Sequence, residues 1–310
     1  MRMIALGQML QDEGNSVHFL TITENKDILG RIAEEGFTIH RISQDGEWEY
    51  SQDAKQLVKL AEEISASWVI LDGYKFDTAY QRIIKEHGLK LMCVDDLAQG
   101  HFLADLVVNQ NINASRDLYS AESYTKFILG PRNAILRREY VKAKSGFKRR
   151  TTEKIENVLV TMGGGDPENV TGKVCRALDA LDGPRMNIKA LVGALNPHYE
   201  DILSYSGVSK NRIEVLRNVG RQMPELMKWA DTGIFAGGST IFEGLYLDLP
   251  LLCCLISSNQ KINYVAETNV EDKYKNILSG LRSVMDFFLL KDIDVSCFNA
   301  KVIMNGALSV

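Results

Sequence analysis

The sequence predicts an α/β fold with a parallel sheet in each of two halves, and three observations support this. The chain has 310 residues, and a chain of this length favours two domains of roughly 150 residues each. Short apolar runs alternate with helical patterns along both halves, which is typical of parallel strands joined by helices. Glycine-rich or polar segments follow several of these runs, at the strand ends where ligands of open α/β sheets bind.

In the first half, the strand patterns lie at residues 17–22, 38–42, 68–71, 91–94 and 106–108. Helical patterns separate them, at residues 2–13, 27–35, 51–65 and 78–87. Gly14 and Gly36 follow two of these helical patterns, as glycine commonly does where a helix ends.

In the second half, the strand patterns lie at residues 157–161, 188–192, 213–216, 232–235 and 251–255, and the first is followed by a helix over 168–181. Helices are also expected over 274–290 and 298–308. Residues 142–154 are rich in Lys and Arg and poor in apolar side chains, which favours a solvated linker over a basic contact patch. We therefore expect domains at residues 1–141 and 155–310, joined by a linker at 142–154.

Composition excludes several classes of protein. The net charge of −4 argues against a nucleic-acid partner, which requires a basic face. The five cysteines form no CxxC pair, so a reduced, cytoplasmic setting is expected. Neither a signal peptide nor a membrane span is expected, because residues 1–10 show no long apolar core and the sequence has no apolar run of about 18 residues. Histidine spacing shows no metal motif, and neither a metal nor a cofactor is expected.

The first candidate ligand-binding loop contains Gly163, Gly164 and Gly165, after the strand at 157–161. Glycines allow a backbone to approach a ligand closely, because no Cβ intervenes. We expect Asp166 to cap the following helix with Pro167 at its first position. The start of that helix would then offer free N–H groups to an anion. A tight turn without a ligand is the alternative.

The second candidate loop contains Gly237, Gly238, Ser239 and Thr240, again between a strand and a helix. The two hydroxyls add donors to the backbone N–H groups, which suits a diphosphate. Glu243 lies about one helical turn further on, where a carboxylate would accept hydrogen bonds from a ribose diol. A capped helix with a helix-forming glutamate is the alternative interpretation.

Other polar residues also follow predicted strands. Asn259 and Gln260 come after the strand at 251–255, and their amides suit the hydroxyl and acetamido groups of a sugar. In the first half, polar segments end strands at residues 71–77, 95–96 and 109–111. The acidic pair Asp95-Asp96 is a candidate Mg²⁺ ligand, but a turn and helix cap is the favoured interpretation.

These segments together resemble a known family. The chain is similar to the nucleotide-sugar hydrolases of pseudaminic acid biosynthesis, the PseG type, and to the spore-coat polysaccharide proteins of the SpsG type. The resemblance covers residues 71–260 and is specific because the segments occur in the same order. The matching segments are LDGYKFD (71–77), VDDLAQGHFLADLVVNQN (94–111), ILGPRNAILRREY (128–140), VTMGGGDPENVTGKV (160–174), LVGALNPHY (191–199), AGGSTIFEGLYLDLP (236–250) and SSNQ (257–260).

The resemblance implies a GT-B fold, with two Rossmann-like domains and a UDP-sugar bound in the cleft between them. It places the diphosphate at residues 163–165 and 238–240, the ribose at Glu243, and the sugar or phosphates at Asn259 and Gln260. It also implies hydrolysis of UDP-2,4-diacetamido-2,4,6-trideoxy-β-L-altropyranose to UDP and free sugar, without a metal or cofactor. On the sugar side it places Tyr74, Asp77 and Asn111.

One departure from this family affects the chemistry. In the family, the first strand leads into a G-x-G-H-x-x-R loop whose histidine is the proposed water-activating base, a role that contributes roughly 10²–10⁴-fold. Met1-Arg2 match the end of that loop, so its strand, glycines and histidine would lie upstream of Met1. Without that strand, neighbouring strands would expose unpaired edges. We therefore expect either a misplaced start codon or a domain that has lost hydrolysis.

The catalytic residues remain unassigned at this stage, with His101, Tyr74 and Asp77 as candidates. His101 follows an acidic pair and precedes a predicted strand, but a structural role is the favoured interpretation. A GT-B glycosyltransferase and a non-catalytic UDP-sugar-binding protein are the alternatives to a hydrolase. The sequence indicates neither the exact sugar nor the oligomeric state.

Overall fold

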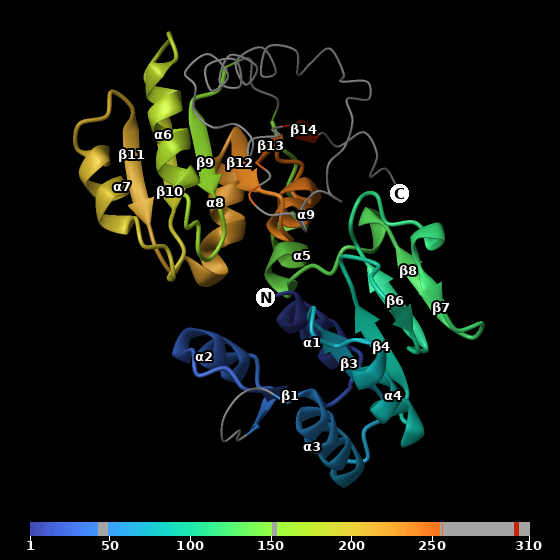
Figure 1. Ribbon diagram of the computed structural model, residues 1–310. Helices are drawn as coiled ribbons and strands as arrows, with labels where there is room; N and C mark the ends of the chain where they lie inside the picture. The colour runs from blue at the N-terminus through green and yellow to red at the C-terminus, as the bar shows by residue number, and fades with distance from the viewer. Residues whose placement is uncertain (43–48, 151–153, 255, 257–300, 304–310) are drawn as a thin grey trace. The chain divides into compact units, whose positions relative to one another are not determined.

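The computed structural model describes residues 1–42, 49–150, 154–254, 256 and 301–303. The chain divides into two compact units, Met1–Arg138 and Glu139–Val310. Parallel strands and helices alternate along both units (Figure 1).

The main sheet of the first unit is parallel, in the order β3-β4-β6-β8. Its strands are β3 (Val69–Asp72), β4 (Leu91–Val94), β6 (Leu106–Asn109) and β8 (Lys126–Leu129). Helices α3 (Tyr50–Glu63) and α4 (Thr78–Glu86) bury their apolar stripes with this sheet, and Val58, Ile84 and Leu91 belong to one core cluster. All four strands end at one edge of the sheet, which brings their polar C-terminal residues together.

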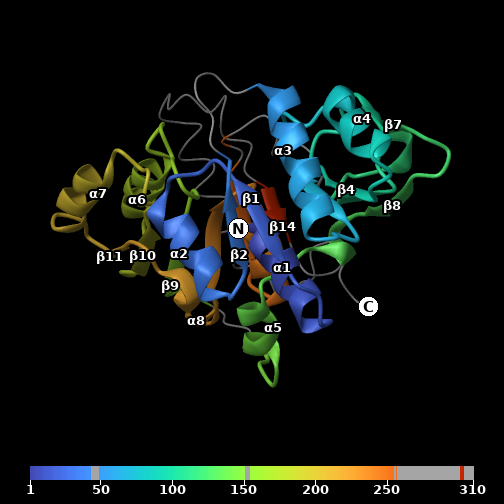
Figure 2. The same ribbon diagram turned by 90° about the horizontal axis from the view of Figure 1, so that it is seen from below.

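Helix α1 (Arg2–Asp12) packs against two separate sheets of this unit. Ala5 and Leu6 lie in one cluster with Val94 and Val108 of the main sheet. Ile4 packs with residues around β1 (His18–Thr21), α2 (Lys26–Glu34) and β2 (Thr38–Arg41), beside which α1 lies in Figure 2. In the described part of the chain, β1 and β3 are edge strands of different sheets.

Short elements complete the first unit. β5 (His101–Phe102) and β7 (Ser120–Ala121) pair in parallel, and two 3₁₀ turns, η1 (Arg116–Leu118) and η2 (Pro131–Asn133), flank the last strands. No hydrophobic pattern predicts β5 and β7, because two residues are too few to show a hydrophobic period.

The second unit contains one sheet in the order β11-β10-β9-β12-β13-β14. Neighbouring strands are parallel except for the last pair, in which β14 is antiparallel to β13. From β9 the chain adds β10 and then β11 on one side of that strand. It then returns to add β12 and β13 on the other side of β9, so the strand order reverses between β9 and β12. The strands are β9 (Asn157–Thr161), β10 (Asn187–Leu191), β11 (Arg212–Leu216), β12 (Thr232–Ala236), β13 (Leu251–Cys254) and β14 (Lys301–Ile303).

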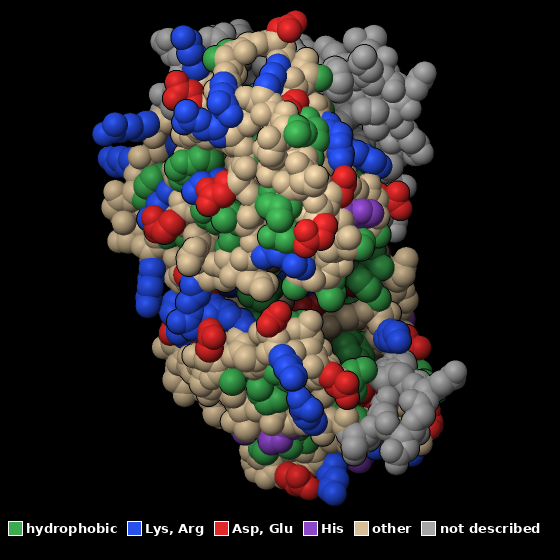
Figure 3. Space-filling model, turned by 90° about the vertical axis from the view of Figure 1, so that its left-hand side faces the viewer, with side chains coloured by type: hydrophobic (Ala, Val, Ile, Leu, Met, Phe, Trp, Pro, Cys, Tyr) green, Lys and Arg blue, Asp and Glu red, His purple; other side chains and the backbone are tan. Residues whose placement is uncertain are grey.

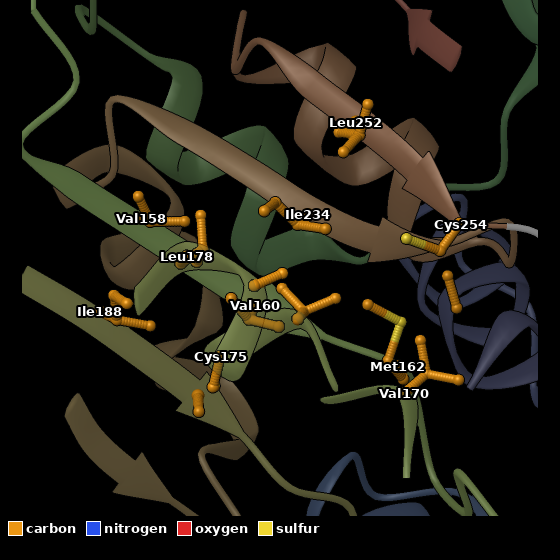
Figure 4. Close-up of a cluster of buried hydrophobic side chains, with 14 residues drawn as sticks. Val158, Val160, Met162, Val170, Cys175, Leu178, Ile188, Ile234, Leu252 and Cys254 are labelled. Carbon is orange, nitrogen blue, oxygen red and sulfur yellow. The ribbon is translucent and has the colours of Figure 1, made fainter. Parts of the chain in front are cut away.

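Helices bury both faces of this sheet. On one face, α6 (Val170–Ala180) packs with Val160, Ile188 and Ile234 (Figure 4). Alternate strand residues point the other way, and there Phe235 and Leu251 lie against α9 (Thr240–Tyr246). The remaining helices are α5 (Arg138–Lys144), α7 (Tyr199–Ser206) and α8 (Met223–Trp229), with η3 (Gly220–Gln222) before α8.

Part of the basic segment 142–154 is anchored to the second unit. Lys144 forms an ion pair with Asp248. The Arg149 guanidinium donates to the carbonyl oxygens of Met227, Ala230 and Leu247, at 2.8, 2.6 and 3.1 Å. Because these carbonyls lie at or just beyond the C-terminal ends of α8 and α9, Arg149 satisfies acceptors that the helices leave open.

The apolar patterns predicted most strands to within a residue, while the end of the chain differs. The helix expected over 298–308 is wrong at residues 301–303, which form strand β14 against β13. The helix expected over 274–290 lies outside the described residues. Among the described helices, none is long and apolar enough to cross a membrane. Basic and acidic side chains are interspersed over the face seen in Figure 3.

Candidate functional site

The reversal of winding in the second unit brings both candidate glycine loops together. Strands β9 and β12 are direct neighbours, with Thr161 opposite Phe235. Adjacent strands lie about 4.8 Å apart, and both end at the same edge of the sheet. The loops that follow them, 163–165 and 237–240, therefore flank the switch point where open α/β sheets bind ligands.

The 163–165 loop is held by close packing against the end of β10. A Cβ on Gly193 would lie 2.3 Å from Gly164 O and 2.5 Å from Gly163 O, so only glycine fits there. The Leu195 N–H donates to Gly164 O at 3.1 Å. By contrast, a Cβ on Gly163 or Gly164 would meet no described atom within 4 Å, which leaves that side of the loop open to a ligand.

The start of α6 differs from the prediction. The helix begins at Val170, after a turn that contains Pro167, so Pro167 is not its first residue. The Asp166 carboxylate accepts from the N–H groups of Val170 and Thr171, at 2.7 and 2.9 Å. Asn169 Oδ1 accepts from Gly172 N–H at 3.1 Å. Asp166 accepts from the first N–H groups of the helix, as expected of a capping side chain, but the N-cap position itself is Asn169. The expectation of free N–H groups at the helix start is wrong.

The 237–240 loop lies between β12 and α9. Gly237 N–H donates to Cys254 O at 3.0 Å, and Gly238 N–H donates to Ala236 O at 2.8 Å, so these bonds fix the turn. Ser239 is exposed, and a Cβ on Gly238 would contact no described atom within 4 Å. Within the described chain, the N–H groups of Ser239 and Thr240 have no recorded acceptor, as expected for the first residues of a helix.

Three further residues of the second unit were predicted to contact the nucleotide-sugar: Glu243, Asn259 and Gln260. Glu243 lies in the first turn of α9, one turn beyond Ser239, and is 6% exposed. Asn259 and Gln260 lie outside the described residues.

In the first unit, the strand ends form a polar cluster around Arg2 and Asp96. The Arg2 guanidinium binds Asp72 at 2.6 Å and Asp96 at 2.6 Å. Asp96 also accepts from the Tyr74 hydroxyl at 3.2 Å and from the Asn111 amide at 3.1 Å. Burial lowers the pKa of Arg2, but hydrogen bonds and the charges of both carboxylates outweigh this and raise it. The guanidinium therefore stays charged and balances both acids.

A second network supports the same strand ends. Tyr119 donates its hydroxyl proton to Asp95 at 2.9 Å and accepts from the Asn109 amide at 2.8 Å. Asn109 Oδ1 accepts from the N–H of Asn111 at 2.9 Å, which orients that residue. Burial and the charge of Asp95 raise the pKa of Tyr119 well above the usual range. The Tyr119 hydroxyl is therefore neutral at physiological pH and links Asp95 to Asn109 by hydrogen bonds.

The candidate catalytic residues of the first unit have distinct environments. Tyr74 is 63% exposed, while its hydroxyl reaches Asp96. Asp77 caps α4 by accepting from Tyr80 N–H at 2.9 Å. The two ring nitrogens of His101 lie 2.8 Å from Ser120 Oγ and 3.2 Å from Glu122 Oε1. Since both ring nitrogens have partners, His101 requires rearrangement before it can activate water.

The structure adds three residues that sequence reasoning missed: Arg2, Asp96 as a shared acceptor, and Gly193. Arg2 lies 94 positions from Asp96, so only the fold reveals their pairing. Gly193 carried a signal, because it directly follows a predicted strand. Among the described residues, no three His, Cys, Asp or Glu side chains are arranged to hold a metal ion.

Comparison with solved structures identifies the fold class. The chain resembles the Staphylococcus aureus MnaA–UDP co-structure with a TM-score of 0.57 and 13% identity, over 92% of this chain and 84% of that one. It resembles a glycosyltransferase from Rickettsia africae with a TM-score of 0.54 and 11% identity, over 95% and 93% of the two chains. The chain therefore has the predicted GT-B-like α/β fold.

Sequence comparison finds two curated relatives. The uncharacterized protein MJ1062 of Methanocaldococcus jannaschii is 30% identical over 248 residues, which cover 77% of this chain and 48% of that protein. The spore coat polysaccharide biosynthesis protein SpsG of Bacillus subtilis is 28% identical over 167 residues, covering 53% and 47%. The matches span about half the length of each relative. No protein-family model matches the chain.

The SpsG match supports the resemblance of the motifs to the spore-coat polysaccharide proteins of the SpsG type. The narrower PseG-type assignment stays a prediction.

Proposed function

We propose that the chain binds a UDP-sugar, with the nucleotide held by the second unit at its topological switch point. The observation that carries this proposal is the pairing of β9 with β12, which places two glycine loops side by side. N–H groups with no recorded acceptor in the described chain, at Ser239 and Thr240, suit a phosphate. Glu243, one turn further into α9, suits the ribose. One structure with this fold, the MnaA co-structure, contains UDP.

The first unit supplies the groups that we propose for the sugar. The exposed Tyr74 and the amide of Asn111 converge on Asp96 at the ends of β3, β4 and β6. Hydroxyl, amide and carboxylate groups provide the donors and acceptors that sugar hydroxyls and acetamido groups need. The Arg2 ion pairs hold this cluster in one geometry, which lowers the ordering cost of binding.

The reaction that we propose is hydrolysis of a UDP-linked diacetamido-trideoxy sugar. Water adds to the anomeric carbon, the bond from that carbon to the phosphate oxygen breaks, and UDP and free sugar are released. The ordered motifs over residues 71–260 support this substrate class. The relative named for spore coat polysaccharide biosynthesis supports a role in surface polysaccharide or nonulosonic acid synthesis, and we propose a cytoplasmic location.

The second candidate function is glycosyl transfer. The likeness to a glycosyltransferase over 95% of the chain favours it, since the same fold serves transfer as well as hydrolysis. The two functions differ in what attacks the anomeric carbon, either water or an acceptor hydroxyl. A binding protein without catalysis is the third outcome, and the engaged ring nitrogens of His101 are consistent with it.

Product analysis separates these functions. The purified chain is incubated with UDP-2,4-diacetamido-2,4,6-trideoxyaltrose, with and without a cell-envelope glycan acceptor, and UDP and sugar are quantified. UDP with an equal amount of free sugar supports hydrolysis. UDP release that requires the acceptor supports transfer, and binding without release supports a binding protein. Absence of any UDP or UDP-sugar binding would overturn the proposal.

A further inference from the structure

Two histidines of the first unit lie side by side on the small sheet formed by β1 and β2, away from the strand ends around Asp96. The strands pair in parallel, with His18 opposite Thr38 and His40 opposite Leu20. Residues two positions apart along a strand point to the same face, so both histidines share one face of the sheet. Nδ1 of His18 lies 3.0 Å from Nε2 of His40, although the two residues are 22 positions apart in the chain.

This contact brings together two nitrogens of the kind that bind transition metals. A hydrogen bond between two imidazoles requires a neutral ring as its acceptor, and neutral imidazole is also the form that coordinates a metal ion. His18 is exposed and His40 is half-buried, so water reaches the pair. An ion that replaces the shared proton would bind both nitrogens and complete its coordination with water molecules.

The distance between the nitrogens favours one class of metal ion. Imidazole nitrogens bind metals at about 2.0–2.1 Å, so two nitrogens 3.0 Å apart subtend an angle of about 91–97° at the ion. This is close to the angle between neighbouring ligands in the tetragonal sites that Cu²⁺ and Ni²⁺ prefer. A tetrahedral Zn²⁺ site, with an angle of about 109°, would need nitrogens about 3.3–3.4 Å apart.

We propose that His18 and His40 form a two-imidazole site for Cu²⁺ or Ni²⁺, in which the ion links β1 to β2. The ion binds once the two rings turn so that both lone pairs point at it. The two strands have four residues each and form a sheet of their own among the described residues. Because a two-stranded sheet is marginally stable by itself, an ion that binds only the paired strands stabilises this part of the first unit.

Calorimetric titration of the metal-free full chain with NiCl₂, at about pH 8 where imidazole is neutral, tests the site. One ion per chain should bind. His18→Ala and His40→Ala should each weaken binding by about tenfold or more, since loss of even an outer partner of a metal ligand costs that much. His87→Ala is the matched control and should leave the affinity unchanged, because the ring of His87 faces Glu62 and not a second imidazole.

Two further measurements examine the geometry and the link between the strands. Electron paramagnetic resonance of the Cu²⁺ complex should show hyperfine coupling to two nitrogens in the wild type and to one in either variant at residue 18 or 40. With free Ni²⁺ at ten times its Kd, exchange of the protected amides of β1 and β2 should slow by about tenfold, while exchange in β4 should not change.

Each measurement also has a result that would overturn the proposal. Absence of saturable Ni²⁺ binding, or equal affinity in the wild type, His18→Ala and His40→Ala, would show that the two rings only share a proton. Coupling of Cu²⁺ to a single nitrogen in the wild type would contradict the paired ligands, and this spectrum decides the question if either variant fails to fold. Unchanged amide exchange in β1 and β2 would contradict the link between the strands.

Discussion

Gly193→Ala should displace the 163–165 loop and weaken both the fold and ligand binding. The added Cβ would lie 2.3 Å from Gly164 O and 2.5 Å from Gly163 O, whereas Cβ atoms essentially never approach closer than 3.0 Å. Backbone carbonyls cannot rotate aside as a side chain can, so the whole loop must shift. The bond from Leu195 N–H to Gly164 O, at 3.1 Å, is strained or lost in the process.

The size of the effect follows from these two losses. Overpacking of a close contact costs about 1–3 kcal/mol, and the lost hydrogen bond adds about 0.5–1.5 kcal/mol. A unit of this size loses roughly 2–4 °C in melting temperature per kcal/mol, so a total cost of about 1.5–4.5 kcal/mol should lower the melting temperature by about 3–18 °C. Loss of loop position should also weaken UDP binding by about tenfold or more.

Thermal denaturation followed by circular dichroism measures the loss of stability, and calorimetric titration with UDP measures the loss of affinity. Two other glycine variants serve as controls. Gly164→Ala adds a Cβ that meets no described atom within 4 Å, so it should keep wild-type stability while its methyl group hinders the ligand. Gly30→Ala lies in an exposed stretch of α2 and should stabilise by about 0.5–1 kcal/mol. Wild-type stability and UDP affinity in Gly193→Ala would refute the close packing of this loop.

Three further predictions concern stability and reactivity. Partial burial raises the pKa of Asp179, but its hydrogen bonds outweigh this effect and lower the pKa. The stability that these bonds contribute is present above about pH 4 and is lost as the pH falls through the pKa of the folded state. The urea midpoint of Asp179→Asn should therefore decline less in acid than that of the wild type. Burial raises the pKa of the Cys175 and Cys253 thiols to about 12, so mass mapping should find them unlabelled by a thiol reagent at pH 8 until urea unfolds the chain. Arg2→Leu leaves two partly buried carboxylates uncompensated and should cost about 2–4 kcal/mol of stability, with Arg2→Lys retaining part of it.

The sequence predicted the strands of the fold well because their signal is local. The pattern at 91–94 matches β4 and the pattern at 157–161 matches β9, since apolar runs of this length arise wherever a parallel strand is buried on both faces. The final helix was predicted wrongly because residues 301–303 pair with β13, and tertiary pairing overrides a weak local helical pattern.

The candidate site was harder to predict than the strands, because some of its contacts depend on the tertiary fold and not on a local pattern. The glycine loops could be found from composition, because their role depends on backbone freedom. The occupied N–H groups at the start of α6 could not be predicted, because the helix begins at Val170 and not at Pro167, and its first N–H groups bind Asp166 and Asn169. The cluster around Asp96 likewise joins residues far apart in the chain, and no local pattern encodes such a contact.

The central claim is that the switch point of the second unit binds a nucleoside diphosphate, and calorimetric titration of UDP tests it most directly. The account predicts one site per chain with a Kd in roughly the micromolar to millimolar range. Ser239→Asp should abolish binding by placing a carboxylate where the phosphate lies, while Ser204→Asp, on the exposed surface of α7, should not affect it. Absence of UDP binding by the wild type, or undiminished binding by Ser239→Asp, would contradict the account.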